Sequence, residues 1–448
     1  MPGIGGITMA KIAIIGTGIS GLGTAYLLNP RHEITVYEKA ARIGGHSRTF
    51  TVDYDGKEIP VDTGFIVFNE KNYPQLTAMF RHLDVPTHAS DMTFAASIRD
   101  GWLEWGAKDA NAIFGQRRNL FRPRFGLLIR DVLRFNAVAE ETAEKYPELT
   151  LDEFIALLGL GDWFRRFYLL PMCSAIWSCP PCEMTRFPAR TLIRFMANHH
   201  LLRASGQPQW RTVTGGSQEY VTRLTEGFAD RIRVNCGAAR VTRGEHGAAV
   251  TDMRGHTETF DHVVFASHGD ETLRVMADAD ARERAILSNF RYQKNTAVLH
   301  RDPSVMPKSK NCWAAWNYAS DGDMAEPQLS VTYWMNKLQG IPNATPLFVT
   351  LNPKTEIAPA LTFDVAEFEH PVFDHAATAA QPQVHQMQGR RNTWYCGAHL
   401  RHGFHEDGLA SAVHVARLLG CETPWSAPTP LFVAPRQPVS MAQDAKAA

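Results

Sequence analysis

The first forty residues combine short apolar runs, closely spaced glycines and one helical stretch. An apolar run at 11–15 enters the hexapeptide Gly16-Thr17-Gly18-Ile19-Ser20-Gly21. A helical stretch that contains Ala25 follows, and a second apolar run at 33–37 leads to Glu38. Short apolar runs bounded by turn signals are typical of buried strands. The pattern therefore predicts a strand, a glycine-rich turn, a helix and a second strand.

Two insertions interrupt the domain that this unit begins. Residues 76–204 are predicted to be mainly helical, with one helix at 151–158 capped near Thr150. Residues 276–389 are predicted to form a sheet, because they carry strand-like runs at 296–300, 329–334 and 347–351. The segments expected to form one discontinuous domain of the α/β class are 10–75, 205–275 and 390–422. The tail at 423–448, rich in Pro, Ala and Gln, is expected to be loosely held.

Three glycines at this spacing, between a strand and a helix, form the fingerprint of a dinucleotide-binding site. Gly16 permits the tight turn, Gly18 lets a pyrophosphate approach the backbone, and Gly21 lets the helix pack on the strand. The pyrophosphate then lies at the helix N-terminus, where free N–H groups and the helix dipole favour an anion. Glu38 is placed to accept hydrogen bonds from ribose hydroxyls, and its charge repels a 2′-phosphate, which disfavours NADP.

Charge and composition narrow the functional classes. The 46 basic and 46 acidic residues give a formal net charge of zero, so no overall field favours nucleic acid as a partner. No stretch reaches the ~18 continuous apolar residues that a membrane-spanning helix requires. The seven cysteines are odd in number and scattered, which is typical of a reduced, cytoplasmic protein.

The residues after Glu38 indicate which dinucleotide is bound. Arg42-Ile43-Gly44-Gly45-His46-Ser47-Arg48-Thr49 resembles the second flavin motif of the FAD-dependent amine oxidase and phytoene desaturase superfamily. The resemblance recurs at 61–65, 212–217, 232–241, 261–267 and 394–412. It implies a Rossmann-type FAD-binding domain with an inserted mixed-sheet and helical substrate domain, and one non-covalent FAD. The residues that the motifs and the glycine unit place at the cofactor are Gly16, Gly18, Ile19, Ser20, Gly21, Glu38, Lys39, Arg42, Gly44, Gly45, His46, Ser47, Gly64, Phe65, Val241, Gly397, Glu406, Asp407, Gly408 and Leu409.

Four further motifs carry a narrower resemblance, at 168–178, 295–300, 313–318 and 403–408. They look like one bacterial branch of the superfamily, associated with cyclopropane-fatty-acid synthase-like methyltransferases. Some members are similar to flavin desaturases on the route to furan fatty acids. The resemblance implies an FAD-dependent oxidoreductase that desaturates a methyl-branched or cyclopropane-related fatty acyl chain of phospholipid by hydride transfer to flavin N5. It also implies a lipid methyltransferase as a partner.

Desaturation needs a base for the second proton and a long apolar pocket. Histidine has a fitting pKa, and the candidates are His300, in the strand-like run at 296–300, and His399, His402 and His405 beside the C-terminal flavin motif. The pocket is expected to include Leu170, Met172, Ile176, Trp177, Trp316 and Tyr333. Two alternatives remain open: a flavin amine oxidase or other small-molecule oxidase, and a non-catalytic flavoprotein partner of a lipid methyltransferase. The lysine motif and paired aromatic cage of monoamine oxidases are not found in this sequence, which counts against amine oxidation.

The segment Phe114 to Phe135 holds six arginines and one acid, Asp131, interleaved with aromatic and aliphatic residues. Such a segment is typical of a helix in an anionic membrane interface, where each basic residue contributes ~1 kcal/mol. The alternative is a solvated basic face on a core helix. With a phospholipid substrate, we expect a cytoplasmic protein that is peripheral at the inner membrane face.

Overall fold

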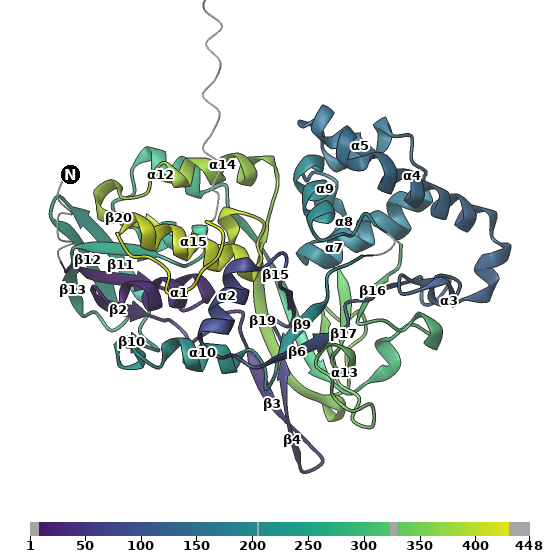
Figure 1. Cartoon of the computed structure of the whole chain (residues 1–448), viewed down its shortest axis with the longest axis horizontal. Coiled ribbons are helices and arrows are strands. Elements are labelled where there is room, and N and C mark those ends of the chain that lie inside the picture. The colour runs from purple at the N-terminus through teal and green to yellow at the C-terminus, as the bar shows by residue number, and fades with distance from the viewer. Residues whose placement is uncertain (1–8, 204–205, 323–328, 430–448) are drawn as a thin grey trace, which may run out of the picture.

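The computed structural model describes residues 9–203, 206–322 and 329–429. Figure 1 shows a Rossmann-type unit at the left and a second unit at the right, in which helices lie above a large sheet. Of the predicted C-terminal tail, residues 430–448 lie outside the described residues.

The Rossmann-type unit is built on a five-stranded parallel sheet, assembled from distant parts of the chain. Its strands, in spatial order, are β10 (Ile232–Arg233), β2 (Glu33–Tyr37), β1 (Lys11–Ile15), β14 (His262–Phe265) and β20 (Thr393–Tyr395). Ile12 and Ile14 face one hydrophobic core, and Ala13 and Ile15 face another, so β1 is buried on both sides. A parallel sheet covered on both faces is the expected outcome of such apolar strands.

Helices on the two faces of this sheet come from all parts of the sequence. One layer holds α1 (Ile19–Leu28), α2 (Pro74–His82), α10 (Gln218–Thr225) and α15 (His405–Leu418). The other layer holds α12 (Ala281–Leu287), α14 (His375–His385) and a three-stranded antiparallel sheet of β11 (Ala238–Gly244), β12 (Gly247–Asp252) and β13 (Thr257–Phe260). The helix α11 (Gly269–Val275) follows β14. The segment 276–389, predicted as a sheet, therefore also supplies two helices to the Rossmann-type unit.

A seven-stranded mixed sheet forms the second unit. Its strands, in spatial order, are β19 (Thr362–Val372), β15 (Arg291–His300), β18 (Phe348–Leu351), β17 (Ser330–Trp334), β16 (Trp316–Ser320), β7 (Phe94–Ile98) and β8 (Leu103–Gly106). The β16–β7 pair is parallel and the other pairs are antiparallel. The region 76–204, predicted to be mainly helical, contributes β7 and β8, since their short apolar runs complete the buried edge of this sheet.

The helical lobe lies over this sheet (Figure 1). Its main helices are α4 (Pro123–Lys145), α5 (Leu151–Leu157), α7 (Leu170–Trp177) and α9 (Ala189–Asn198), with the shorter α3 (Ala110–Ile113), α6 (Asp162–Phe164) and α8 (Pro181–Met184). The predicted cap of α5 is confirmed: the Thr150 hydroxyl accepts from the Glu153 N–H, and the Glu153 carboxylate accepts from the Thr150 N–H. The helix α7 packs against β16 and β19.

Short strands run between the two units. They are β3 (Thr49–Tyr54) paired with β4 (Lys57–Asp62), and β5 (Phe68–Asn69), β9 (Trp210–Val213) and β6 (Thr87–Ser90) in a three-stranded sheet. The short helix α13 (Met335–Leu338) follows β17. Among the helices of the described ranges, none combines the length and the apolar character needed to cross a membrane. The structure confirms the predicted α/β class, a discontinuous Rossmann-type unit with an inserted mixed sheet and helical lobe.

Candidate FAD-binding and catalytic site

The glycine turn after β1 leaves an open, electropositive space in front of α1. Gly18 is the N-cap of α1 in extended conformation, no side chain caps the helix, and its first turn has no acidic residue. The first N–H groups of a helix lack partners within the helix, so they point outward with the positive end of the dipole. A Cβ atom built on Gly18 would meet nothing within 4 Å. This arrangement fits the pyrophosphate of a dinucleotide.

The second glycine pair completes the same cradle. The Gly44 N–H donates to the Thr17 carbonyl at 3.0 Å, and a Cβ on Gly45 would lie 3.0 Å from Gly18 Cα. Gly44 and Gly45 both have positive φ, at 106° and 57°, which a side chain would strain. Arg42 donates to the Gly45 carbonyl at 2.9 Å, so its guanidinium is held at the edge of the cradle.

The acid at the end of β2 is fixed beside the glycine turn. Glu38 Oε2 accepts from the Thr17 N–H at 3.1 Å, and Oε1 accepts from the Ala40 N–H at 2.8 Å. This is the position from which Glu38 would accept ribose hydroxyls. The neighbouring Lys39 forms an ion pair with Glu271 on α11. Val241, expected to contact adenine through its backbone, is fully buried and its carbonyl accepts from the Ala277 N–H at 3.0 Å. A carbonyl oxygen has a second lone pair, so the contact of Val241 with adenine stays a prediction.

The C-terminal motif lies directly against the glycine turn. A Cβ on Gly408 would lie 2.7 Å from Ile19 Cγ2 and 2.9 Å from Ser20 Oγ, so α15 and α1 meet at their N-terminal ends. Leu409 is fully buried at this contact. The Gly397 N–H donates to Ser411 Oγ at 2.8 Å, which ties the loop after β20 to α15.

The two acids of this motif hold backbone rather than facing open space. Glu406 accepts from the N–H groups of Gln75 and Leu76, at 3.0 and 2.9 Å, and so caps α2. Burial raises the pKa of Glu406 to about 8. Asp407 accepts from the Phe404 N–H at 3.0 Å, at the start of α15. Both carboxylates thus cap helices, and their role toward the flavin stays a prediction.

His405 joins three of the predicted cofactor segments. Its Nε2 is 2.9 Å from Ser47 Oγ and 2.8 Å from the Tyr220 hydroxyl, and its ring stacks on Phe65 with the ring centroids 3.9 Å apart. Gly64 is required here because a Cβ would lie 2.0 Å from the His46 carbonyl oxygen. Burial lowers the pKa of His405 to about 3. The ring is a neutral, hydrogen-bonded connector, and this placement does not suit a catalytic base.

The other three predicted histidines occupy different environments. His300 is fully buried, with Nε2 2.7 Å from Thr350 Oγ1 and Nδ1 accepting from the Asp302 N–H at 3.1 Å. Both ring nitrogens are engaged, which argues against catalysis by His300. His399 is buried edge-on against Phe290, with the ring centroids 4.8 Å apart. Burial lowers the pKa of His402 as well. Within the described ranges, His402 Nδ1 is buried without a hydrogen-bond partner, so this nitrogen could accept a proton.

The six predicted pocket residues are brought together in one hydrophobic core between the helical lobe and the large sheet. This core contains Leu170, Met172, Trp177 and Tyr333, with Ile176 and Trp316 partly buried against it. The Trp316 and Tyr333 rings meet edge-on, with centroids 5.3 Å apart.

Trp177 continues this core toward the C-terminal motif. Its Nε1 donates to the His402 carbonyl at 3.3 Å. Phe195 of α9 lies between Trp177 and Phe404, with ring centroids 4.8 and 4.7 Å away. An aromatic wall of Trp177, Phe195 and Phe404 therefore connects the helical lobe to the flavin motif.

A polar cluster at the junction of the two units was missed by sequence reasoning. His46 of the second glycine loop lies 5.3 Å from His370 and 5.1 Å from Phe368, between ring centroids. His370 Nδ1 is 2.9 Å from Asn295 Nδ2, and burial lowers the pKa of His370 to about 4. Phe368 and His370 lie two residues apart and so on the same face of β19. This spacing was the only signal in the sequence that could have indicated the cluster.

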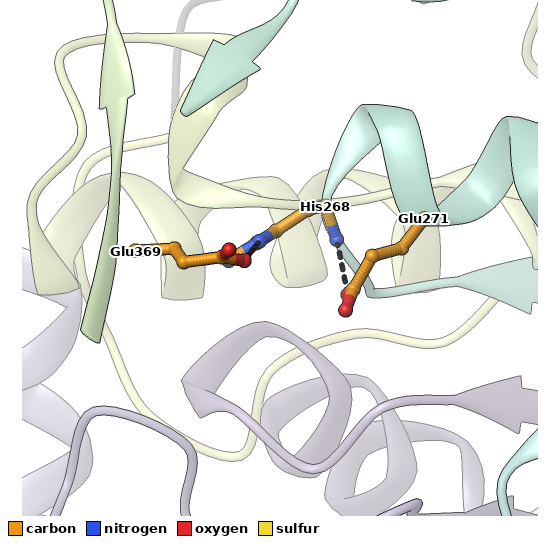
Figure 2. A group of neighbouring side chains, drawn as sticks. All are labelled: His268, Glu271 and Glu369. Atoms are coloured by element: carbon orange, nitrogen blue, oxygen red, sulfur yellow. Dashed lines mark hydrogen bonds and ion pairs between the residues drawn. The ribbon is translucent and has the colours of Figure 1, made fainter. Parts of the chain in front are cut away.

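A second group bridges the same junction. Figure 2 shows His268, at the start of α11, between Glu271 and Glu369 of β19. One imidazole nitrogen of His268 and one carboxylate oxygen of each glutamate, atoms of the kind that bind metal ions, lie within 4.8 Å of one another. His268 Nδ1 is 3.5 Å from Glu369, and its ring stacks on Tyr292. Lys39 already neutralises Glu271, so the group is described best as an ion-pair network that joins the two units.

The fold and the glycine cradle define a flavoprotein, and the sequence comparison agrees. The model of the flavin containing amine oxidoreductase family matches residues 19–301, and this chain belongs to that family. It is an FAD-dependent oxidoreductase, and its α1 cradle and Glu38 fit FAD. No curated protein sequence matches the chain.

Solved structures share the whole fold at low identity. A CLA-producing fatty acid isomerase from P. acnes is 16% identical, with a TM-score of 0.63 over 91% of this chain and 98% of its own. A putative protoporphyrinogen oxidase from Exiguobacterium sp. 255-15 is 14% identical, with a TM-score of 0.64 over 92% and 99%. Cyclohexylamine oxidase from Brevibacterium oxydans IH-35A is 14% identical, with a TM-score of 0.63 over 92% and 100%. These likenesses concern the fold.

Proposed function

We propose that this oxidoreductase desaturates a fatty acyl chain, and that its substrate is a methyl-branched or cyclopropane-related chain esterified in phospholipid. The observation that carries the proposal is the aromatic wall of Trp177, Phe195 and Phe404, which continues the apolar core at α7 up to the flavin motif. Apolar and aromatic side chains bind hydrocarbon by burying it from water. The fatty acid isomerase of similar fold supports the same substrate class.

The reaction removes two hydrogens from neighbouring carbons of the chain. FAD, when bound, accepts one of them as a hydride. The other leaves as a proton, and His402 is the residue we assign to take it. Burial keeps the pKa of His402 below its usual value, so the ring is neutral at pH 7, and its Nδ1 is without a partner among the described residues. The Asp407 carboxylate then favours the protonated ring.

Oxidation of an amine is the second candidate function, because the family description and the cyclohexylamine oxidase fold favour it. An amine oxidase binds a cationic or polar head group. The two acids that follow Phe404 of the aromatic wall in the chain, Glu406 and Asp407, accept hydrogen bonds from backbone N–H groups. This arrangement supports an apolar substrate over an amine.

A lipid methyltransferase, which would supply the methyl branch, is the partner that we propose for the desaturase, on a route to furan fatty acids.

The test is anaerobic stopped-flow spectroscopy of the flavin-loaded protein. A methyl-branched phospholipid should bleach the flavin, and a panel of amines should not. Bleaching by amines alone would refute the desaturase proposal in favour of amine oxidation. Loss of flavin reduction with every lipid and amine would favour a non-catalytic partner of a methyltransferase.

The assignment of the base has its own test. His402→Ala should lower the rate of flavin reduction by about a hundredfold while the FAD content stays unchanged. His300→Gln is the matched control, since His300 is sealed in the sheet with both nitrogens engaged. It should leave the rate within about twofold of the wild type. Equal rates in wild type and His402→Ala would remove His402 from the mechanism without affecting the substrate assignment.

A further inference from the structure

A basic and apolar surface covers the outer end of the helical lobe. We call it the outer basic surface: it consists of the turn Arg117–Phe121, Arg122 and the first half of α4, residues 123–134. Figure 1 places α4 at the edge of the molecule away from the Rossmann-type unit. Ten large hydrophobic side chains are exposed in the described part of the chain, and four of them lie on this surface: Leu120, Phe121, Leu127 and Leu133. Phe121 is 86% exposed.

Such a cluster is unusual on a protein surface that faces only water. Single exposed apolar residues are normal, but a group of them beside uniform charge marks an interaction site. The core side of α4 is already satisfied, because Phe125, Leu128 and Phe135 are buried in the lobe. The exposed apolar residues therefore belong to a second, outward face of this segment.

One arginine of the outer basic surface, Arg130, is paired with Asp131 at 2.8 Å. The others form no ion pair within the described ranges, so their charge is not neutralised. Arg118 donates to the Trp102 carbonyl at 2.8 Å, and Arg122 donates to the same carbonyl at 2.9 Å. Carbonyls orient a guanidinium without cancelling its charge. Within the described ranges, the side chains of Arg124 and Arg134 form no hydrogen bond and no ion pair. The first half of α4 has one acid, Asp131, which is buried and paired with Arg130, and the acids at 140, 141 and 144 lie in its other half.

Two tryptophans border the same surface. Trp102 and Trp163 are partly buried, with ring centroids 5.5 Å apart, and the Arg122 guanidinium lies 5.0 Å from a Trp102 ring. Tryptophan and arginine beside exposed aliphatic residues match the layered chemistry of a bilayer interface, where apolar atoms enter the acyl boundary and cations meet phosphates.

We propose that the outer basic surface docks on an anionic phospholipid bilayer, with Leu120 and Phe121 entering the interface and Arg124 and Arg134 on lipid phosphates. This proposal rests on the proposed function, because docking would bring the enzyme to a phospholipid acyl substrate that lies in the bilayer. A nucleic acid would meet the same arginines but offers no apolar layer for Phe121.

The experiment is co-sedimentation of the flavin-loaded full chain with vesicles of straight-chain phosphatidylcholine, with and without about one third phosphatidylglycerol. We expect binding to the anionic vesicles that weakens as salt is raised. The double variant Arg124→Gln with Arg134→Gln should weaken binding about 25-fold, because each arginine near an anionic surface contributes about fivefold. Phe121→Ala should weaken it by about fivefold or more.

Matched controls separate the surface from general charge and hydrophobicity. Arg31→Gln with Arg254→Gln removes two exposed arginines of the Rossmann-type unit, and Leu157→Ala removes a 49% exposed leucine elsewhere in the lobe. Both should bind like the wild type, and all variants should keep their FAD. Equal binding by the surface variants and the wild type, equal binding to neutral vesicles, or no binding by the wild type would each overturn the proposal. Because these lipids carry no branch, binding without flavin bleaching by a branched lipid would leave the docking intact and refute the desaturase function.

Discussion

Gly18→Val should remove FAD binding while leaving the apoprotein folded. Gly18 has φ −65° and ψ 177°, a conformation that any residue adopts, so the substitution brings no backbone strain. A Cβ at this position meets no protein atom within 4 Å. The valine side chain would therefore fill the space in front of the α1 N-terminus, where the pyrophosphate binds.

The size of the effect follows from binding linkage. At a free FAD concentration of 100 times Kd, the cofactor stabilises the wild-type protein by about 2.7 kcal/mol. In a chain of this length each kcal/mol shifts the melting midpoint by about 2 °C, so wild type with FAD should melt about 5 °C above its apoprotein. Gly18→Val should melt with the wild-type apoprotein whether or not FAD is added.

The assay pairs flavin absorbance of the purified protein with thermal melts. Gly21→Ala is the contrasting variant, because its Cβ would lie 1.9 Å from the Gly16 carbonyl oxygen and would force the turn apart. That variant should lose both FAD and stability. Stoichiometric FAD in Gly18→Val would refute the cradle assignment, and a melt well below the wild-type apoprotein would refute the claim that the space is free.

Two further predictions concern the cofactor linkage and pH. Acid precipitation should release the flavin into the supernatant, and a yellow pellet would show a covalent bond, for example to Cys396. Burial raises the pKa of Asp62 from 3.8 to about 6. Because the folded pKa lies above the unfolded one, the free energy of unfolding should fall by about 2 kcal/mol as pH rises from about 4 to 6. Urea titrations across this range should show a flatter dependence in Asp62→Asn, and an unchanged slope would contradict the raised pKa.

The sequence predicted the cofactor half of the protein more fully than the substrate half. The glycine unit, the acid of β2 and the strand–helix order are local patterns, and short-range sterics fix them within a few residues. The sheet of the second unit was predicted less completely. Its strand β7, with the hairpin partner β8, joins the sheet through β16, where Phe94 lies opposite Trp316. Nothing in a short apolar run such as 94–98 indicates so distant a partner.

The functional histidines show the same limit at the level of side chains. His300 and His405 were equal candidates in the sequence, but the fold surrounds them with Thr350 in one case and with Ser47 and Tyr220 in the other. Ser47 lies 358 residues from His405. His370, absent from the predicted site, lies next to His46 because β19 reaches across the junction of the two units.

By itself, then, the sequence determined that this chain binds a dinucleotide through α1, since three glycines and an acid at fixed spacing encode a turn geometry that needs no distant partner. Only the tertiary structure decided which side chains are free to act. The pKa of a buried group and its unused hydrogen-bond donors and acceptors depend on its neighbours in space. Packing brings those neighbours from any part of the chain. Glu406 is the plainest case: its motif indicates the flavin, and only the fold shows that its carboxylate also caps α2 through two backbone contacts.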